Sequence, residues 1–79
     1  MSANIAVTEA DIRAIIQQVV SEEVAVSLAP DQSFLEAGLD SLERAQILIQ
    51  LEEDFGVSLS DDDFENCNSI ADILKYARP

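Results

Sequence analysis

Apolar residues recur with the three- and four-residue spacing of an α-helix in three separate stretches of this chain. The first stretch follows Thr8, and Asp11 stands three residues later as in a capping box, which predicts a helix that runs to about Glu23. Its inward-facing positions would be Ile12, Ile15, Ile16, Val19 and Val20. The sequence contains neither the alternation typical of strands nor an internal repeat, so it predicts a helical fold.

The second stretch predicts the longest helix, over residues 41–55. Asp40 occupies the N-cap position, Glu43 completes a capping box, and Gly56 ends the helix as a C-cap. At about 100° per residue, one apolar stripe faces the core and a narrower one lies nearly opposite. The core stripe comprises Ile47, Leu48, Leu51 and Phe55, and the outer stripe comprises Leu42, Ala45 and Ile49. Because so small a protein has little with which to cover both sides, we expect the outer stripe to be an exposed docking surface.

Residues 24–39 lack helical periodicity and contain Pro30, which predicts a long connection. Loops of this length are uncommon unless something holds them in place. The side chains that we expect to do so by burial are those of Leu28, Phe34, Leu35 and Leu39.

After Gly56, Ser60 and three successive aspartates predict a brief helix that carries Phe64, and Asn68 or Ser69 would cap a last helix that ends near Tyr76. In that last helix Ile70, Ile73, Leu74 and Ala77 would face inward, with Lys75 and Arg78 near its negative end. We therefore expect one all-α domain over residues 1–79, a small four-helix bundle of three main helices and one short helix, with a long loop between helices one and two.

Composition narrows the range of functions. The chain has 79 residues, no histidine, one cysteine and a formal net charge of −12. Such a charge repels nucleic acid and anionic membrane surfaces and favours basic partners. No metal site is expected, because the acidic run at 61–65 lacks the glycine and the terminal glutamate of a calcium loop. Because the chain offers no nucleophile–base pair, an enzyme is the least favoured class of function. We also expect the protein to be a monomer in the cytoplasm.

Ser41 is the best candidate for chemical modification. Asp40 already fills the N-cap, so Ser41 is the first helical residue and its hydroxyl is not needed as a cap. Since no histidine is available to activate it, the hydroxyl is better interpreted as a group to be modified than as a nucleophile. A helix start also stabilises a phosphate through its unpaired N–H groups and the positive end of the macrodipole.

Two segments carry a family resemblance. Residues 34–42, Phe-Leu-Glu-Ala-Gly-Leu-Asp-Ser-Leu, and residues 51–56, Leu-Glu-Glu-Asp-Phe-Gly, resemble the acyl carrier protein family, and the similarity covers nearly the whole chain. The resemblance implies that Ser41 carries a 4'-phosphopantetheine arm, which a separate phosphopantetheinyl transferase takes from coenzyme A. It also implies a carrier, whose arm holds an acyl group as a thioester for enzymes of fatty-acid, polyketide or related biosynthesis.

The resemblance places partner docking on the helix that begins at Ser41. A loading ligase and downstream synthases or transferases with basic patches would contact its outer stripe and the polar groups beside it. The expected docking residues are Asp40, Leu42, Glu43, Ala45, Gln46 and Ile49.

Two residues of this helix depart from the pattern of the fatty-acid carriers. Gln46 occupies a position where a glutamate that pairs with basic enzyme patches is usual, which removes a docking charge. Arg44 occupies a position where a small residue is more usual, on the core side of the first turn. We expect its guanidinium to turn outward or to pair with an acid. As a residue for cargo specificity it would disfavour a long apolar chain, so the cargo would be short or polar, or would stay outside the bundle.

Two alternatives remain open at this point. An aminoacyl or peptidyl carrier, loaded by an adenylate-forming ligase, receives mild support from Arg44 and Gln46. An acidic interaction module that docks on a basic partner and never carries an arm is the alternative from another class.

Overall fold

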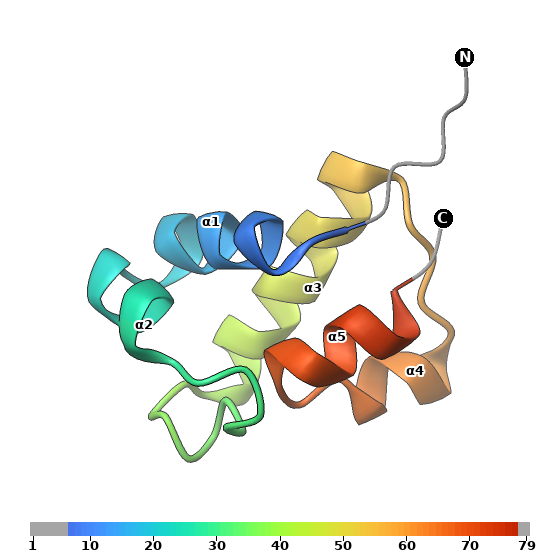
Figure 1. Ribbon diagram of the computed structural model, residues 1–79. Helices are drawn as coiled ribbons and strands as arrows, with labels where there is room; N and C mark the ends of the chain where they lie inside the picture. The colour runs from blue at the N-terminus through green and yellow to red at the C-terminus, as the bar shows by residue number, and fades with distance from the viewer. Residues whose placement is uncertain (1–6, 78–79) are drawn as a thin grey trace.

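The structure, a computed structural model, describes residues 7–77 (Figure 1). Its helices are α1 (Glu9–Val19), α2 (Glu22–Ser27), α3 (Ser41–Phe55), α4 (Asp61–Asn66) and α5 (Ile70–Tyr76). In the view of Figure 1, α1 and α2 lie to the left of α3, and α4 and α5 lie to its lower right. The all-α helical bundle expected from the sequence is confirmed, although residues 7–77 contain five helices and not the four predicted, and the longest helix has the predicted bounds.

The first helix is shorter than its periodicity predicts, because a second helix begins almost at once. Thr8 and Asp11 form the expected capping box, but α1 ends at Val19 instead of near Glu23. Ser21 adopts an extended backbone and its hydroxyl accepts the Val24 N–H at 3.2 Å, which makes it the N-cap of α2. A capping residue has non-helical backbone angles, so Ser21 interrupts what would otherwise be one continuous helix.

The connection before α3 is therefore shorter than predicted and is held by three of the four expected side chains. Leu28, Phe34 and Leu39 are buried, whereas Leu35 is 65% exposed, so the prediction for Leu35 is wrong. Phe34 points into the core, and the next residue, Leu35, points away from it. The Phe34 N–H also donates to the Asn68 carbonyl at 2.8 Å, which ties the connection to the residues before α5.

The core lies between α1, α3, α5 and their connections. Its largest fully buried side chains are Phe34, Ile12, Ile16, Ile47, Leu48, Leu51, Ile70, Ile73 and Cys67. Val19, Val20 and Phe55 are partly buried and pack against this cluster.

The last helix, α5, is capped by Ser69, whose hydroxyl accepts the Asp72 N–H at 3.1 Å. Ile70, Ile73 and Ala77 are buried as predicted, but Leu74 is 40% exposed, so its inward prediction is wrong. Leu74 follows Ile73 by about 100° around the helix, which carries it past the edge of the buried stripe. Arg78 lies outside the described residues.

No helix within residues 7–77 combines the length and hydrophobicity that crossing a bilayer requires.

Candidate functional site

The start of α3 has the geometry that its sequence predicts. Asp40 Oδ1 accepts the Glu43 N–H at 2.8 Å, and Glu43 Oε1 accepts the Asp40 N–H at 3.1 Å. This reciprocal capping box makes Ser41 the first helical residue. Ser41 is exposed, and its hydroxyl forms no hydrogen bond to the rest of residues 7–77. The hydroxyl is therefore accessible to a modifying enzyme.

A buried anchor immediately before Asp40 holds this helix start in position. Leu39 is 3% exposed, and its N–H donates to the Phe34 carbonyl at 2.9 Å. Gly38 allows the tight return of the chain, because its φ of 95° is one that residues with a side chain rarely adopt. Ser41 is thus exposed on a firmly packed support.

The helix start also suits the phosphate of a phosphodiester. Both carboxylates of the capping box are bonded to backbone N–H groups, and the Arg44 N–H donates to the Asp40 carbonyl. The backbone N–H groups of Ser41 and Leu42 have no acceptor in the described part of the chain. Such unpaired donors at the positive end of a fifteen-residue helix stabilise an anion attached to the first residue. Residues 40–44 therefore fit a phosphopantetheine group on Ser41.

Two of the three residues of the outer stripe of α3 are exposed beside Ser41, as predicted. Leu42 and Ile49 are 66% and 47% exposed, whereas Ala45 between them is partly buried. Gln46 is exposed, and Glu43 is partly buried. Ile47, Leu48 and Leu51 on the opposite side are fully buried, which leaves the outer stripe as surface.

Arg44 does not behave as the sequence led us to expect. Its guanidinium neither turns outward nor pairs with an acid: Nη1 donates to the Phe64 carbonyl at 2.7 Å and to the Cys67 carbonyl at 3.1 Å. The guanidinium carbon also lies 5.4 Å from the centre of the Phe64 ring. The last carbonyls of a helix lack intrahelical donors and carry its negative dipole end, which explains why a cation binds at the end of α4.

The one cysteine of the chain, Cys67, is fully buried behind this contact. The pKa of its thiol is raised from 9.0 to about 11, mainly by burial and also by the nearby carboxylates of Asp72 and Asp63, while Arg44 lowers it by less. Because the thiolate is the reactive form, this thiol is inert at neutral pH. Cys67 is therefore a small buried hydrophobe of the core.

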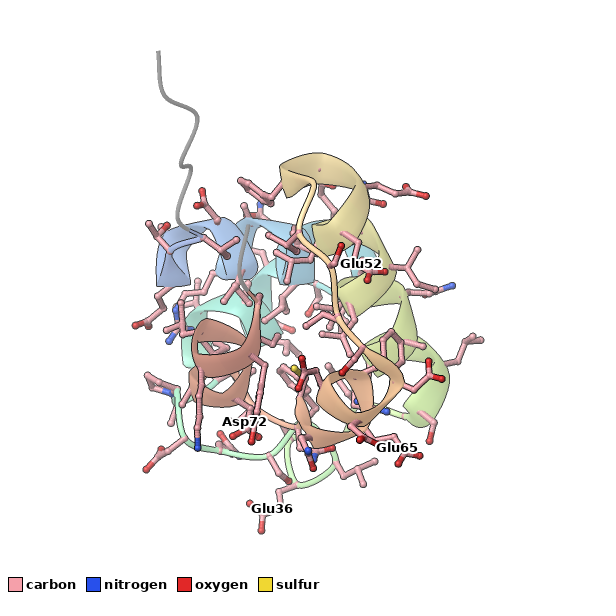
Figure 2. All side chains as sticks on the ribbon, turned by 90° about the vertical axis from the view of Figure 1, so that its right-hand side faces the viewer. Glu36, Glu52, Glu65 and Asp72 are labelled. Carbon is pink, nitrogen blue, oxygen red and sulfur yellow. The ribbon has the colours of Figure 1, made fainter. Side chains whose placement is uncertain are left out.

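Acidic side chains from three segments gather toward one end of the molecule. Figure 2 labels Glu36 before α3, Glu65 of α4 and Asp72 of α5 toward the same end, which is also the end where α3 begins in Figure 1. No group of three or more potential metal ligands comes together within residues 7–77. Glu52, labelled in Figure 2 farther along α3, has a structural contact: its Oε2 accepts the Leu59 N–H at 3.0 Å, which fixes the connection after Gly56.

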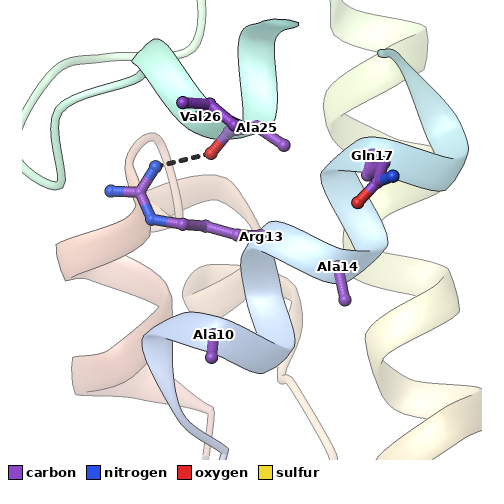
Figure 3. Close-up of a pocket in the computed structure, with 6 residues that line it drawn as sticks. All are labelled: Ala10, Arg13, Ala14, Gln17, Ala25 and Val26. Atoms are coloured by element: carbon purple, nitrogen blue, oxygen red, sulfur yellow. Dashed lines mark hydrogen bonds between the residues drawn. The ribbon is translucent and has the colours of Figure 1, made fainter. Parts of the chain in front are cut away.

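A groove of about 420 Å³ lies between α1 and α2, away from the predicted site (Figure 3). Its lining residues are Ala10, Arg13, Ala14, Gln17, Ala25 and Val26. Arg13 crosses it to donate to the Ala25 carbonyl at 2.7 Å. None of the predicted site residues lines this groove, so it adds nothing to the site on α3.

Comparison with known proteins gives the class of this chain. Residues 10–77 match the family described as phosphopantetheine attachment site. The mitochondrial acyl carrier protein of Dictyostelium discoideum is 36% identical over 75 residues, which cover 91% of this chain and 62% of that protein. The acyl carrier protein of Helicobacter pylori (strain ATCC 700392 / 26695) is 35% identical over 65 residues, which cover 77% of this chain and 83% of that protein. No solved structure matches the chain.

The family match and the helix start on α3 together define a carrier that bears a covalently attached 4'-phosphopantetheine group and is not itself an enzyme. The chain belongs to the acyl carrier protein family. It spans less than two thirds of the length of the Dictyostelium protein. Membership sets aside the alternative of an interaction module that never carries an arm, and the carrier role implies contact with a phosphopantetheinyl transferase and with synthase enzymes.

Proposed function

We propose that Ser41 carries the 4'-phosphopantetheine arm and that the protein delivers acyl groups to enzymes of fatty-acid, polyketide or related biosynthesis. The observation that carries this proposal is the exposed Ser41 hydroxyl at the first position of α3, where Asp40 and Glu43 already do the capping. The thiol of the arm supplies the thioester chemistry.

In the attachment step Ser41 Oγ would form a bond to the phosphorus next to the pantetheine of coenzyme A, and the adenosine 3',5'-bisphosphate portion would leave. The proton of the hydroxyl has to pass to a base of the transferase, because the chain has no histidine. The N–H groups of Ser41 and Leu42 remain available to the attached phosphate.

The docking surface in this proposal is the outer stripe of α3 with the polar groups at its edge. Leu42, Ala45 and Ile49 would supply apolar contacts, and Leu42 is the most exposed of the three. Asp40 and Glu43 would supply charge beside Ser41, and Gln46 a neutral polar contact. The net charge of −12 would steer basic enzyme surfaces toward the protein, while apolar burial would hold the complex.

The domain organisation, oligomeric state and location of the protein are expected from its sequence alone. That the protein works as a single-domain monomer in the cytoplasm stays a prediction. The name of the Dictyostelium relative places that protein in mitochondria.

Intact mass spectrometry tests the attachment. The protein is incubated with coenzyme A and a phosphopantetheinyl transferase of broad specificity, and the expected result is the gain of one phosphopantetheine, mapped to Ser41 in the peptide digest. Ser41→Ala should gain nothing, and Ser58→Ala, which removes another exposed serine, should be modified like the wild type. An unmodified wild type, or a Ser41→Ala variant that still gains the mass, would contradict the proposal.

An aminoacyl or peptidyl carrier is the second candidate, favoured by exposed Gln46 where the fatty-acid carriers usually have a glutamate. A panel of ligases separates the two, because the modified protein is loaded either by a fatty-acyl ligase or by an amino-acid-activating ligase. Gln46→Glu should improve loading by the fatty-acyl ligase if only the missing charge limits docking. Loading by an amino-acid-activating ligase alone would favour the second candidate.

A further inference from the structure

α4 has the weakest anchorage of its own in this bundle. Among the helices within residues 7–77, it is the one that contains no buried residue. Its largest side chain, Phe64, is only partly buried. A helix of six residues is also far too short to be stable alone in water. Its position must therefore depend on contacts from outside the helix.

Arg44 supplies such contacts from the first turns of α3. One nitrogen, Nη1, donates to the carbonyls of Phe64 and Cys67, in the last turn and at the C-cap of α4. The guanidinium also stands over the Phe64 ring, at 5.4 Å from its centre. A single side chain thus satisfies the C-terminal end of α4, contacts its aromatic residue and joins both to α3.

This contact lies next to the proposed attachment point. Residues three apart are neighbours on a helix surface, so Arg44 lies directly beside Ser41 on α3. A group tethered to Ser41 that moved between α3 and α4 would meet the guanidinium first. To admit it, Arg44 would have to give up two carbonyls in a partly buried position, where water replaces the lost hydrogen bonds poorly.

We propose that Arg44 is a latch between α3 and α4 that keeps the thioester-bound group outside the bundle, so that the protein favours short or polar acyl groups over long apolar ones. The statement about cargo rests on the proposed function, because it needs an arm on Ser41. The latch itself does not, so the two are tested separately.

Amide hydrogen exchange of the unmodified protein tests the latch. Arg44→Ala should speed exchange of the α4 amides on the order of tenfold to a hundredfold, the loss expected for hydrogen bonds from a charged donor, with little change in α2. Arg13→Ala is the matched control, because Arg13 donates to the Ala25 carbonyl of α2 at the same distance of 2.7 Å. This control should speed α2 and spare α4. Unchanged α4 exchange in Arg44→Ala, or equal acceleration of both helices, would overturn the latch.

The cargo statement is tested on the modified protein, loaded with acetyl or octanoyl groups by transfer from the corresponding acyl-coenzyme A. In the wild type, the two forms should have the same Tm and the same amide spectrum for α4 and for the buried side of α3. In Arg44→Ala, the octanoyl form should melt higher than the acetyl form and shift those amides, because a buried chain binds only the folded state. A higher Tm for the octanoyl form of the wild type, or no difference in the variant, would overturn the statement.

Arg44→Gln is the second variant if Arg44→Ala does not fold, because its amide can still donate one hydrogen bond to a carbonyl without the charge. In amide exchange and in the comparison of acetyl and octanoyl forms, Arg44→Gln should fall between the wild type and the result expected for Arg44→Ala. If Arg44→Gln matches the wild type in both measurements, the latch is overturned. If no form is modified at Ser41, the proposed function and the cargo statement fall together, while the exchange experiment still decides the latch.

Discussion

The two short helices α2 and α4 are of equal length, and an arginine of a longer helix donates to each of them, yet they are held in different ways. α2 packs against α1 and buries Ala25, with the buried Leu28 at its end, and the hydrogen bond from Arg13 is added to that packing. α4 buries no residue completely, and Arg44 substitutes for packing there. An arginine hydrogen bond can therefore reinforce a packed interface, as at α2, or take the place of one, as at α4.

Of these two helices, the less firmly packed one, α4, is the one connected to the proposed attachment site. Elements that move in function are drawn from the least stable parts of a structure, which have few buried apolar contacts. α4 is such an element, and Arg44 connects it to the helix turn that carries Ser41. The α2 end contains none of the proposed site residues.

The largest effect on the free energy of unfolding should come from shortening apolar side chains at the α1–α2 end and at the α4 end of the molecule. Ile16→Ala empties a fully buried position of α1 and should lower the free energy of unfolding by about 2–5 kcal/mol. Phe64→Ala removes a larger but only partly buried side chain of α4 and should cost about 1–2 kcal/mol. Urea unfolding monitored by circular dichroism measures both. Equal losses would show that α4 is packed as firmly as the α1–α2 end.

The next effect is a pH dependence at the α4 end. The pKa of the buried Cys67 thiol is about 11 against 9.0 for an ordinary thiol, so the folded state disfavours the thiolate. The protonated thiol contributes its full stability to the folded state below pH 9. This contribution is lost as the pH rises from 9 to 11, because the thiol of the unfolded chain releases its proton first. We expect wild type to lose about 2 kcal/mol more than Cys67→Ala between pH 8 and pH 11.

Cys67→Ala is the control in that experiment because it removes the thiol and keeps every other ionisable group of the chain. Parallel pH curves for wild type and Cys67→Ala would contradict the prediction. Alkylation at pH 8 separates the effects of the two arginines: Arg44→Ala should expose the thiol at the end of α4 to the reagent more often, and Arg13→Ala should not.

Interactions between near neighbours in the chain could be predicted from the sequence. The capping box of Asp40 and Glu43, the C-cap at Gly56 and the exposed outer stripe all depend on residues within one helix, and all are present. α2 was missed because the predicted first helix extends past Ser21 to about Glu23 and the residues after it show no helical periodicity, although a serine followed by two glutamates is itself a helix-start pattern.

Contacts between distant residues could not be predicted in the same way. The choice of Phe34 over Leu35 for burial depends on how the connection meets residue 68, far away in the sequence. The carbonyl partners of Arg44 lie 20 and 23 positions away, and no periodicity in α3 indicates them. Angular counting placed Arg44 on the core side but could not show that the end of α4 lies there.

Helix caps provide a smaller and more local test. Ser21 and Ser60 are the N-caps of α2 and α4, and each hydroxyl accepts an N–H three residues later, at 3.2 and 3.1 Å. Ser21→Ala should lower global stability by about 1 kcal/mol, because α2 folds together with the core. Ser60→Ala should cost about 0.5 kcal/mol or less in global unfolding and act mainly by faster exchange of the α4 amides. The reverse order of global losses would contradict the comparison.

The smallest effect on stability should come from the exposed apolar side chains at the two ends. Leu42 beside Ser41 and Val26 of α2 are 66% and 75% exposed, so Leu42→Ala and Val26→Ala should each change the free energy of unfolding by less than about 0.5 kcal/mol. Only Leu42→Ala should lower kcat/KM for modification by a phosphopantetheinyl transferase, by about threefold to tenfold, as expected for an apolar contact at the edge of an interface. Since the two variants match in exposure and apolar character, equal rates would mean that the surface beside Ser41 is no more a docking site than the surface of α2.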